Sequence, residues 1–215
     1  MALAFAALAV LALAVAGGCS QTAMIFPAPA QGREPAYPEN LVRTRDATFL
    51  YFQGAKVVAY FHGNGEDLAD SVPMVSLLRS LRAESGVDAG RVVLLGQSLG
   101  AGVATEMAKR GLGARMVLVS PFTSVADMAR RMVPFFPASW VRHRFDTQSK
   151  AAAIGLPVLI VHGTEDEVVP FAMGEQLARS FPRAQLVPIP GGQHNDLLAM
   201  HAIPMREALS PFLKF

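Results

Sequence analysis

Short apolar runs that alternate with longer segments of helical periodicity constrain the fold of this chain more than any other feature. The strand-like runs are Ala47–Phe52, Lys56–Phe61, Arg91–Leu95, Arg115–Val119, Pro157–Val161 and Gln185–Ile189. The segments with apolar residues at helical spacing are Val72–Glu84, Ala101–Arg110, Ser124–Met132, Phe171–Ser180 and Asp196–Leu209. Strands that alternate with helices form sheets covered on both faces, so we predict an α/β domain with a doubly wound, mostly parallel sheet over residues 45–215.

One active site is expected, because 215 residues suffice for one α/β domain with a sizeable core and are too few for two. Ligands of doubly wound sheets bind beyond the carboxyl ends of the strands. The residues that directly follow each predicted strand are therefore the candidates for chemistry.

Residues 1–19 have the features of an export signal. The run Ala2–Ala16 contains only Ala, Leu, Val and Phe, and no charged side chain precedes Arg33. The run is shorter than the ~20 residues that span a bilayer comfortably, which favours a cleaved signal over an uncleaved anchor. Residues 20–44 are rich in Pro, Ala and polar side chains without a period, as expected of a tether.

Cys19 closes the apolar run in the sequence Ala-Gly-Gly-Cys. This sequence resembles the lipobox of bacterial lipoproteins, although Ala16 stands where Leu is usual and the usual basic residues before the run are absent. The resemblance implies that Cys19 is lipidated and that the exported protein is anchored to a bacterial membrane, facing outside the cytoplasm. Plain secretion and an uncleaved anchor are the alternatives.

Charge and cysteine content argue against a nucleic-acid-binding protein and against a protein stabilised by internal disulfides. The formal net charge is +2, and the basic residues are scattered without aromatic interleaving, so no nucleic-acid surface is indicated. Because Cys19 is the only cysteine, the chain forms no internal disulfide, and the core alone must stabilise it.

A strand-to-helix turn carries the candidate nucleophile. Gly96-Gln97-Ser98-Leu99-Gly100 lies between a predicted strand and a predicted helix. Glycines are needed where flanking side chains would collide, and the amides of a helix N-terminus point toward developing negative charge. The Gly-x-Ser-x-Gly pattern in this context predicts Ser98 as a nucleophile. A glycine-rich turn that serves packing or phosphate binding is the alternative.

Candidate acids and a candidate base follow two later strands. The carboxylates Glu165, Asp166 and Glu167 come shortly after Pro157–Val161, and His194 lies in a glycine-hinged loop after Gln185–Ile189. One of the carboxylates could orient the histidine.

His194 is the preferred base among the five histidines of the chain. His62 and His162 each precede a glycine at a strand end, where a turn-stabilising histidine is the commoner role. His143 lies in an irregular polar stretch, and His201 lies within the last predicted helix. No paired spacing such as His-x-x-x-His accompanies His194, so no metal site and no metal or organic cofactor are predicted.

The loop His62-Gly63-Asn64-Gly65 follows the strand Lys56–Phe61. A loop of small residues there can turn a backbone N–H toward a substrate carbonyl. We expect the amides of Leu99 and Asn64 to form an oxyanion hole, with an ordinary glycine-rich connection as the alternative for the Asn64 loop.

The motifs together resemble the α/β-hydrolase superfamily, closest to bacterial hydrolases related to eukaryotic depalmitoylating and lysophospholipid-cleaving enzymes. They are His62-Gly63-Asn64-Gly65, Gly96-Gln97-Ser98-Leu99-Gly100, Ser120-Pro121-Phe122-Thr123-Ser124, His162-Gly163 with Asp166 and Pro170, and Gly192-Gln193-His194. The resemblance implies hydrolysis of an ester or thioester through an acyl-enzyme, with Ser98, Asp166 and His194 as a catalytic triad in the chain order of this superfamily.

The chain departs from the family pattern before the nucleophile. Only about 25 residues, Glu66–Gly90, separate the His-Gly-Asn loop from the nucleophile strand, which is room for one crossover helix and not for helix, strand and helix. We predict a shortened sheet in which Val72–Glu84 crosses directly from Lys56–Phe61, which becomes nearly an edge strand. One clear run, Ala47–Phe52, stands where relatives carry a hairpin.

Large apolar residues are frequent between the strand Arg115–Val119 and the strand of the acid. Packing of helices onto the sheet accounts for most of them, and Phe136 and Trp140 are the candidates for contact with substrate.

The sequence thus predicts a carboxylesterase or thioesterase whose substrate is a small-molecule or lipid ester. A serine peptidase or acyltransferase with the same triad, and a shortened, non-catalytic binding lipoprotein, are the alternatives.

Overall fold

The computed structural model describes part of the chain, namely residues 40–43, 48–50, 57–63, 92–135 and 137–213. Several predictions concern residues outside this part: the export signal with Cys19, most of the tether, Asn64, the crossover helix Val72–Glu84 and Phe136. No helix in the part of the chain that the structure describes is long and apolar enough to cross a membrane.

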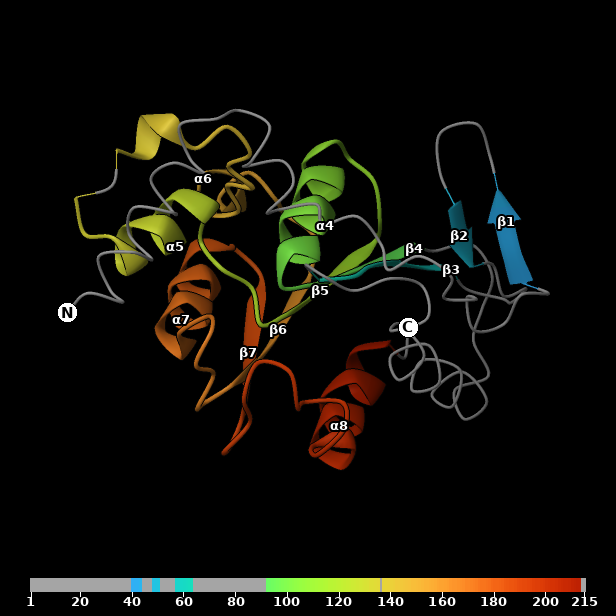
Figure 1. The fold of residues 1–215 in the computed structure, drawn as a ribbon. Helices are drawn as coiled ribbons and strands as arrows, with labels where there is room; N and C mark the ends of the chain where they lie inside the picture. Colours follow the sequence, from blue (N-terminus) through green and yellow to red (C-terminus); the bar gives the residue numbers. More distant parts are fainter. Residues whose placement is uncertain (1–39, 44–47, 51–56, 64–91, 136, 214–215) are drawn as a thin grey trace.

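A five-stranded, fully parallel sheet forms the centre of the described structure (Figure 1). Its strands follow one another in chain order across the sheet: β3 (Val57–Phe61), β4 (Val92–Gln97), β5 (Arg115–Val119), β6 (Val158–Gly163) and β7 (Ala184–Ile189). The prediction of a parallel α/β sheet is confirmed.

Helices cover both faces of this sheet. The helices of the described structure are α4 (Leu99–Lys109), α5 (Val125–Met132), α6 (Gln148–Ala151), α7 (Phe171–Ser180) and α8 (Ala202–Leu213), with a short 3₁₀ turn η2 (Ala138–Trp140). The connections from β4 to β7 place α4, α6 and α7 against one face, as right-handed crossovers between successive neighbouring strands require. Helix α8 follows the last strand and covers the opposite face.

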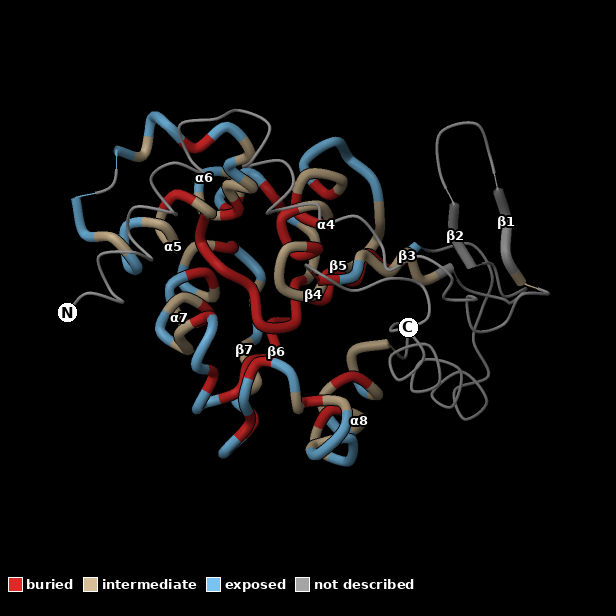
Figure 2. The backbone as a smooth tube through the Cα atoms, in the orientation of Figure 1, coloured by how far each residue is buried: buried red, intermediate tan, exposed pale blue. Residues whose placement is uncertain are grey.

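Side chains alternate between these two faces along each central strand, as strand geometry dictates. Leu94, Leu118 and Ile160 pack under α4 and α7, while Leu95 and Val161 pack under α8. All five are at most 2% exposed. Figure 2 shows this continuous buried band along β5 and β6.

The two end strands of the described sheet differ from its centre. β3 pairs with β4 from Val57 opposite Val92 to Phe61 opposite Gly96, and in the described residues no strand lies on its other side. β7 holds Pro188, a residue that sheets tolerate at an edge because it donates no hydrogen bond.

A two-stranded antiparallel sheet precedes the main sheet: β1 (Leu41–Arg43) pairs with β2 (Thr48–Leu50). Strand β1 lies in residues predicted to belong to the tether, where only the run Ala47–Phe52 was expected to form a strand, so this part of the prediction was wrong. A strand of three residues is too short to show a period of two, and only its pairing identifies it.

The last helix begins later than its sequence pattern indicates. Residues 196–201 form turns, and α8 starts at Ala202. Pro204 is the third residue of α8, a first-turn position where proline is well tolerated, whereas Pro211 lies inside the helix, where it leaves one helical hydrogen bond unmade.

Candidate active site

Ser98 lies on a strained turn between β4 and α4. Its φ of 50° and ψ of −114° fall outside the ordinary region for a residue with a side chain, and its N–H donates to Val119 O at 2.9 Å. The strand thus continues up to the serine, and the helix begins at the next residue. Strain of this kind at a serine between a strand and a helix is typical of a nucleophile elbow.

The two glycines of the elbow are required by close backbone contacts. A Cβ on Gly96 would lie 2.3 Å from Gly100 O, and a Cβ on Gly100 would lie 2.0 Å from Phe61 O, at the end of β3. Side chains at either position would push the turn away from the sheet. The end of β3 therefore lies directly against the turn that carries Ser98.

Asp166 lies in the turn that follows β6, with its side chain fully buried. Its Oδ1 accepts hydrogen bonds from the backbone N–H groups of Val168 (3.0 Å) and Val169 (2.7 Å). The turn itself therefore holds Oδ1 in place.

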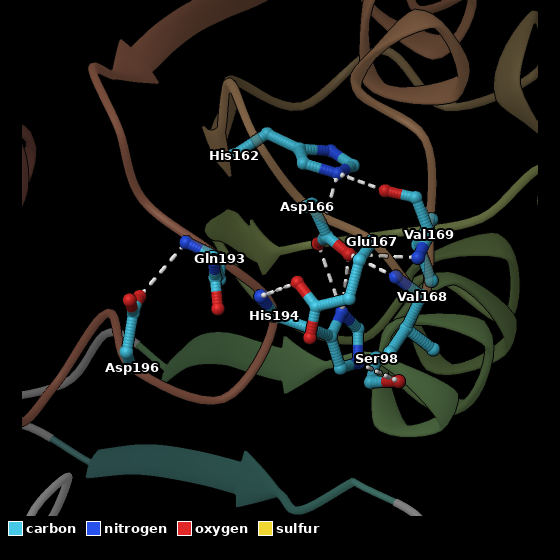
Figure 3. Close-up of polar contacts among 9 residues, drawn as sticks. All are labelled: Ser98, His162, Asp166, Glu167, Val168, Val169, Gln193, His194 and Asp196. Atoms are coloured by element: carbon cyan, nitrogen blue, oxygen red, sulfur yellow. Dashed lines mark hydrogen bonds and ion pairs between the residues drawn. The ribbon is translucent and has the colours of Figure 1, made fainter.

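His194 connects this carboxylate to the serine (Figure 3). Its Nδ1 lies 2.8 Å from Oδ2 and 3.1 Å from Oδ1 of Asp166, and its Nε2 lies 3.0 Å from Ser98 Oγ. An ionised carboxylate only accepts, so the proton sits on Nδ1 and leaves Nε2 free to accept from the serine hydroxyl. The imidazole is 8% exposed and the carboxylate is shielded completely.

Tight backbone packing fixes the two loops that carry Asp166 and His194. A Cβ on Gly163 would lie 2.1 Å from Gly192 O, and Glu165 N donates to the same oxygen at 3.0 Å. In the second loop, Gln193 N donates to Asp196 Oδ1 at 2.8 Å. Asp166 and His194 therefore occupy loops that hold each other in place.

Hydrogen bonds keep Asp166 ionised. Burial of the side chain raises its pKa, but the hydrogen bonds from His162, His194 and Val169 outweigh burial and hold the pKa well below the ordinary value of a carboxyl group. Asp166 is therefore an anion at neutral pH and favours a positive charge on His194.

The structure describes only two of the four residues predicted for the oxyanion hole and for substrate contact. Leu99 is the first residue of α4, where backbone N–H groups have no acceptor within the helix. Trp140 lies in η2 and is 54% exposed. Asn64 and Phe136 lie outside the described residues.

The expectation that the apolar residues after β5 pack onto the sheet is wrong for two of them. Met132 is 71% exposed and Phe135 is 97% exposed. Both lie at or just beyond the end of α5, and neither forms part of the core clusters on the two faces of the sheet.

His162 is the residue of this site whose importance the sequence analysis missed. It is fully buried, and its Nε2 lies 3.2 Å from Asp166 Oδ2 and 2.8 Å from Val169 O. The spacing of four residues between His162 and Asp166 was the one sequence signal for this contact. It becomes informative only once the chain is known to turn back after Gly163. The other histidines make different contacts: His62 Nδ1 donates to Gly63 O at 2.9 Å, and His201 Nε2 lies 3.8 Å from Asp196 Oδ1.

No group of three or more His, Cys, Asp or Glu side chains that could hold a metal ion occurs within the described ranges. The polar groups of the site bind one another in a chain from Ser98 to Asp166, which suits proton transfer.

A parallel sheet, a strained serine turn after β4 and a histidine bonded to a buried carboxylate define an α/β-hydrolase. The chain belongs to the family described as esterase PHB depolymerase, whose model matches residues 55–187, more than half of the chain. The fold class and the family match both agree with the resemblance seen in the sequence motifs.

Curated relatives share part of this chain. An uncharacterised protein of Mycobacterium tuberculosis is 34% identical over 136 residues, which are 62% of this chain and 48% of that protein. Human alpha/beta hydrolase domain-containing protein 17C is 33% identical over 123 residues, which are 55% of this chain and 36% of that protein. The chain thus spans about half the length of these relatives, or less.

Solved structures show the same fold at low sequence identity. An esterase from Pyrococcus furiosus matches with a TM-score of 0.63 and 14% identity, covering 89% of this chain and 97% of that chain. Est1E from Butyrivibrio proteoclasticus matches with a TM-score of 0.58 and 17% identity, covering 74% and 86%.

Proposed function

We propose that this chain is a serine hydrolase that cleaves a carboxylic ester or thioester through an acyl-enzyme. The observation that carries the proposal is the continuous hydrogen-bonded chain from Ser98 Oγ through His194 to Asp166, at 3.0 Å and 2.8 Å. Membership of an esterase family favours esters over other acyl substrates.

In the proposed reaction, Ser98 Oγ bonds to the substrate carbonyl carbon while its proton passes to His194 Nε2. The imidazolium then gives that proton to the leaving alcohol or thiol as the carbon–oxygen or carbon–sulfur bond breaks. Water attacks the acyl-serine, His194 takes its proton, and the proton returns to Ser98 as the carboxylic acid leaves. Asp166 holds the imidazole in the required tautomer and stabilises its positive charge throughout.

The carbonyl oxygen carries negative charge in both tetrahedral intermediates and needs donors. We assign the first donor to the backbone N–H of Leu99 at the start of α4, and the second to the loop of Asn64 that follows β3. The close contact of Gly100 with the end of β3 supports this assignment, because it holds the start of that loop against the elbow.

The substrate is proposed to be a small-molecule or lipid ester that contacts Trp140 and Phe136. The exposure of Trp140 supports a contact that a substrate can reach. Lipidation of Cys19, and with it anchoring to a bacterial cell membrane facing outside the cytoplasm, is proposed from the resemblance of residues 16–19 to a lipobox.

A fluorophosphonate probe tests the function on the full chain. We expect labelling of the wild-type protein, hydrolysis of p-nitrophenyl butyrate, and loss of both in Ser98→Ala. The loss of turnover is expected to be on the order of 10⁴ to 10⁶. Ser149→Ala, at an exposed serine of α6, is the matched control and should keep both activities.

Circular dichroism establishes that each sample is folded. Labelling of Ser98→Ala, or unchanged ester hydrolysis by it, would refute the assignment of the nucleophile. A folded wild-type chain that neither reacts with the probe nor hydrolyses the ester would instead indicate a binding protein with this fold.

A further inference from the structure

His162 is a buried titratable residue that the proposed reaction does not use. It is the penultimate residue of β6, is 0% exposed, and lies on the opposite side of Asp166 from Ser98 (Figure 3). Its Nε2 lies 2.8 Å from Val169 O and 3.2 Å from Asp166 Oδ2. Asp166 is therefore bracketed by two histidines, one leading to Ser98 and the other leading away from it.

The surroundings of His162 select one protonation state. Its Nδ1 is buried and has no hydrogen-bond partner among the residues that the structure describes. A proton on Nδ1 would be a buried donor without an acceptor, which is costly. The ring is therefore neutral and carries its proton on Nε2, which it shares between Val169 O and Asp166 Oδ2.

Helix α7 holds the ring in this position. A Cβ on Gly174, in the second turn of the helix, would lie 2.5 Å from His162 Nδ1. The ring of Phe171 meets the imidazole edge to face, with centroids 5.7 Å apart. Glycine is unfavourable inside a helix relative to alanine, and the close approach of the imidazole explains its presence here.

We infer that His162 is a positioning residue that holds the carboxylate of Asp166 in the orientation His194 needs. The inference rests on the proposed function, since it assigns a role within that triad. Val168 and Val169 donate to Oδ1, and His162 donates to Oδ2. Donors on both oxygens fix the rotation of the carboxylate, which backbone donors on a single oxygen leave partly free.

Two substitutions at position 162 separate hydrogen bonding from packing. His162→Phe fills the space without a donor, and His162→Gln places an amide N–H near the position of Nε2. We expect His162→Phe to lower kcat for p-nitrophenyl butyrate on the order of 10²-fold with KM nearly unchanged, as a displaced catalytic group does. We expect His162→Gln to recover most of that loss.

Nuclear magnetic resonance of the full chain, labelled with ¹⁵N at histidine, tests the hydrogen bonds of both rings without any substrate. The Nδ1–H signal of His194, which Asp166 Oδ2 accepts at 2.8 Å, should be resolved in the wild type, be lost or displaced in His162→Phe and return in His162→Gln. The wild-type spectrum should also show His162 as the neutral Nε2–H tautomer. A wild-type chain without esterase activity would refute the proposed function, while these spectra would still decide the role of His162.

Gly174→Ala is a second route to the same test if the position-162 variants do not fold. It keeps the His162 side chain but displaces its ring, and it should lower kcat and displace the Nδ1–H signal of His194. Gly155→Ala is the control, because a Cβ there meets no atom within 4 Å. A folded His162→Phe variant with wild-type kcat and an unchanged His194 Nδ1–H signal would overturn the inference. So would a His162→Gln variant that is as impaired as His162→Phe in both measurements.

Discussion

Two regions at the carboxyl edge of the sheet differ in how tightly they are packed. The loops after β6 and β7 are buried, whereas the segment between β5 and β6 exposes several large apolar side chains. Asp166 and His194 are each 8% exposed as whole residues, and Gly163 and Gly192, which join their loops, leave no room for a Cβ. Met132, Phe135 and Trp140, in the segment between β5 and β6, are 71%, 97% and 54% exposed (Figure 2). Proton transfer needs fixed distances, whereas recognition of an ester needs only accessible apolar surface, so the two tasks can be assigned to differently packed parts of one edge.

The largest loss of activity should follow a substitution in the buried loops that changes a charge and keeps the size of the side chain. Asp166→Asn removes the charge and turns a hydrogen-bond donor toward His194, which favours the wrong tautomer. If the proposed triad is correct, we expect kcat to fall on the order of 10⁴-fold, the loss typical of this substitution in serine hydrolase triads, with the fold retained. Steady-state hydrolysis of p-nitrophenyl butyrate measures this, and a loss of less than tenfold would remove Asp166 from the triad.

Gly163→Ala should disturb the buried loops of Asp166 and His194 by separating their backbones. The added Cβ would lie 2.1 Å from Gly192 O, so the two loops must separate. We expect the free energy of unfolding in urea to fall by roughly 1–3 kcal/mol and kcat to fall on the order of 10²-fold. Gly155→Ala is the control, and equal effects of the two variants would contradict the packing argument.

Changes to the exposed segment should leave stability nearly untouched. Phe135→Ser alters a side chain that is 97% exposed, so the free energy of unfolding should change by less than about 0.5 kcal/mol. Leu159→Ala, at a core residue that is 0% exposed, should cost about 2–5 kcal/mol in the same urea titration. A comparable loss in both variants would show that the segment is packed more firmly than its exposure indicates.

The smallest effect is expected at the ion pairs between α4 and α6. The hydrogen bond and charge of Lys150, with a contribution from Arg110, lower the pKa of Glu106 from 4.5 to about 2. A lowered pKa means that the stabilisation is fully present above pH 4.5 and is lost as the pH falls toward 2. Glu106→Gln should melt slightly below the wild type at pH 7 and together with it at pH 2, and a gap that persists at pH 2 would contradict this.

Much of the sheet could be predicted because its signals are local. β5 and α7 have the bounds that their apolar patterns indicate, and the other four strands of the main sheet differ by one or two residues. The serine turn was also predictable, since its glycines and the flanking strand and helix are contiguous in sequence. The structure brings Ser98, Asp166 and His194 into hydrogen-bond contact, while their roles in catalysis stay predictions.

The features that sequence reasoning missed depend on contacts between distant parts of the chain. β1 is identified by its pairing with β2, and the burial of His162 by α7 depends on how that helix lies on the sheet. The exposure of Phe135 has the same origin, because an apolar residue is buried only when another element covers it. Composition and residue spacing do not show which distant segment packs against a given residue.

The strand order of the main sheet has a consequence for synthesis on the ribosome. Each strand from β4 to β7 pairs with the strand made just before it, so the sheet can grow one strand at a time as the chain emerges. Ser98 is made 96 residues before the histidine that deprotonates it in the proposed reaction. A nascent chain can therefore complete most of its sheet while its hydroxyl is still chemically inert, and it would acquire reactivity only when nearly the whole domain has left the ribosome.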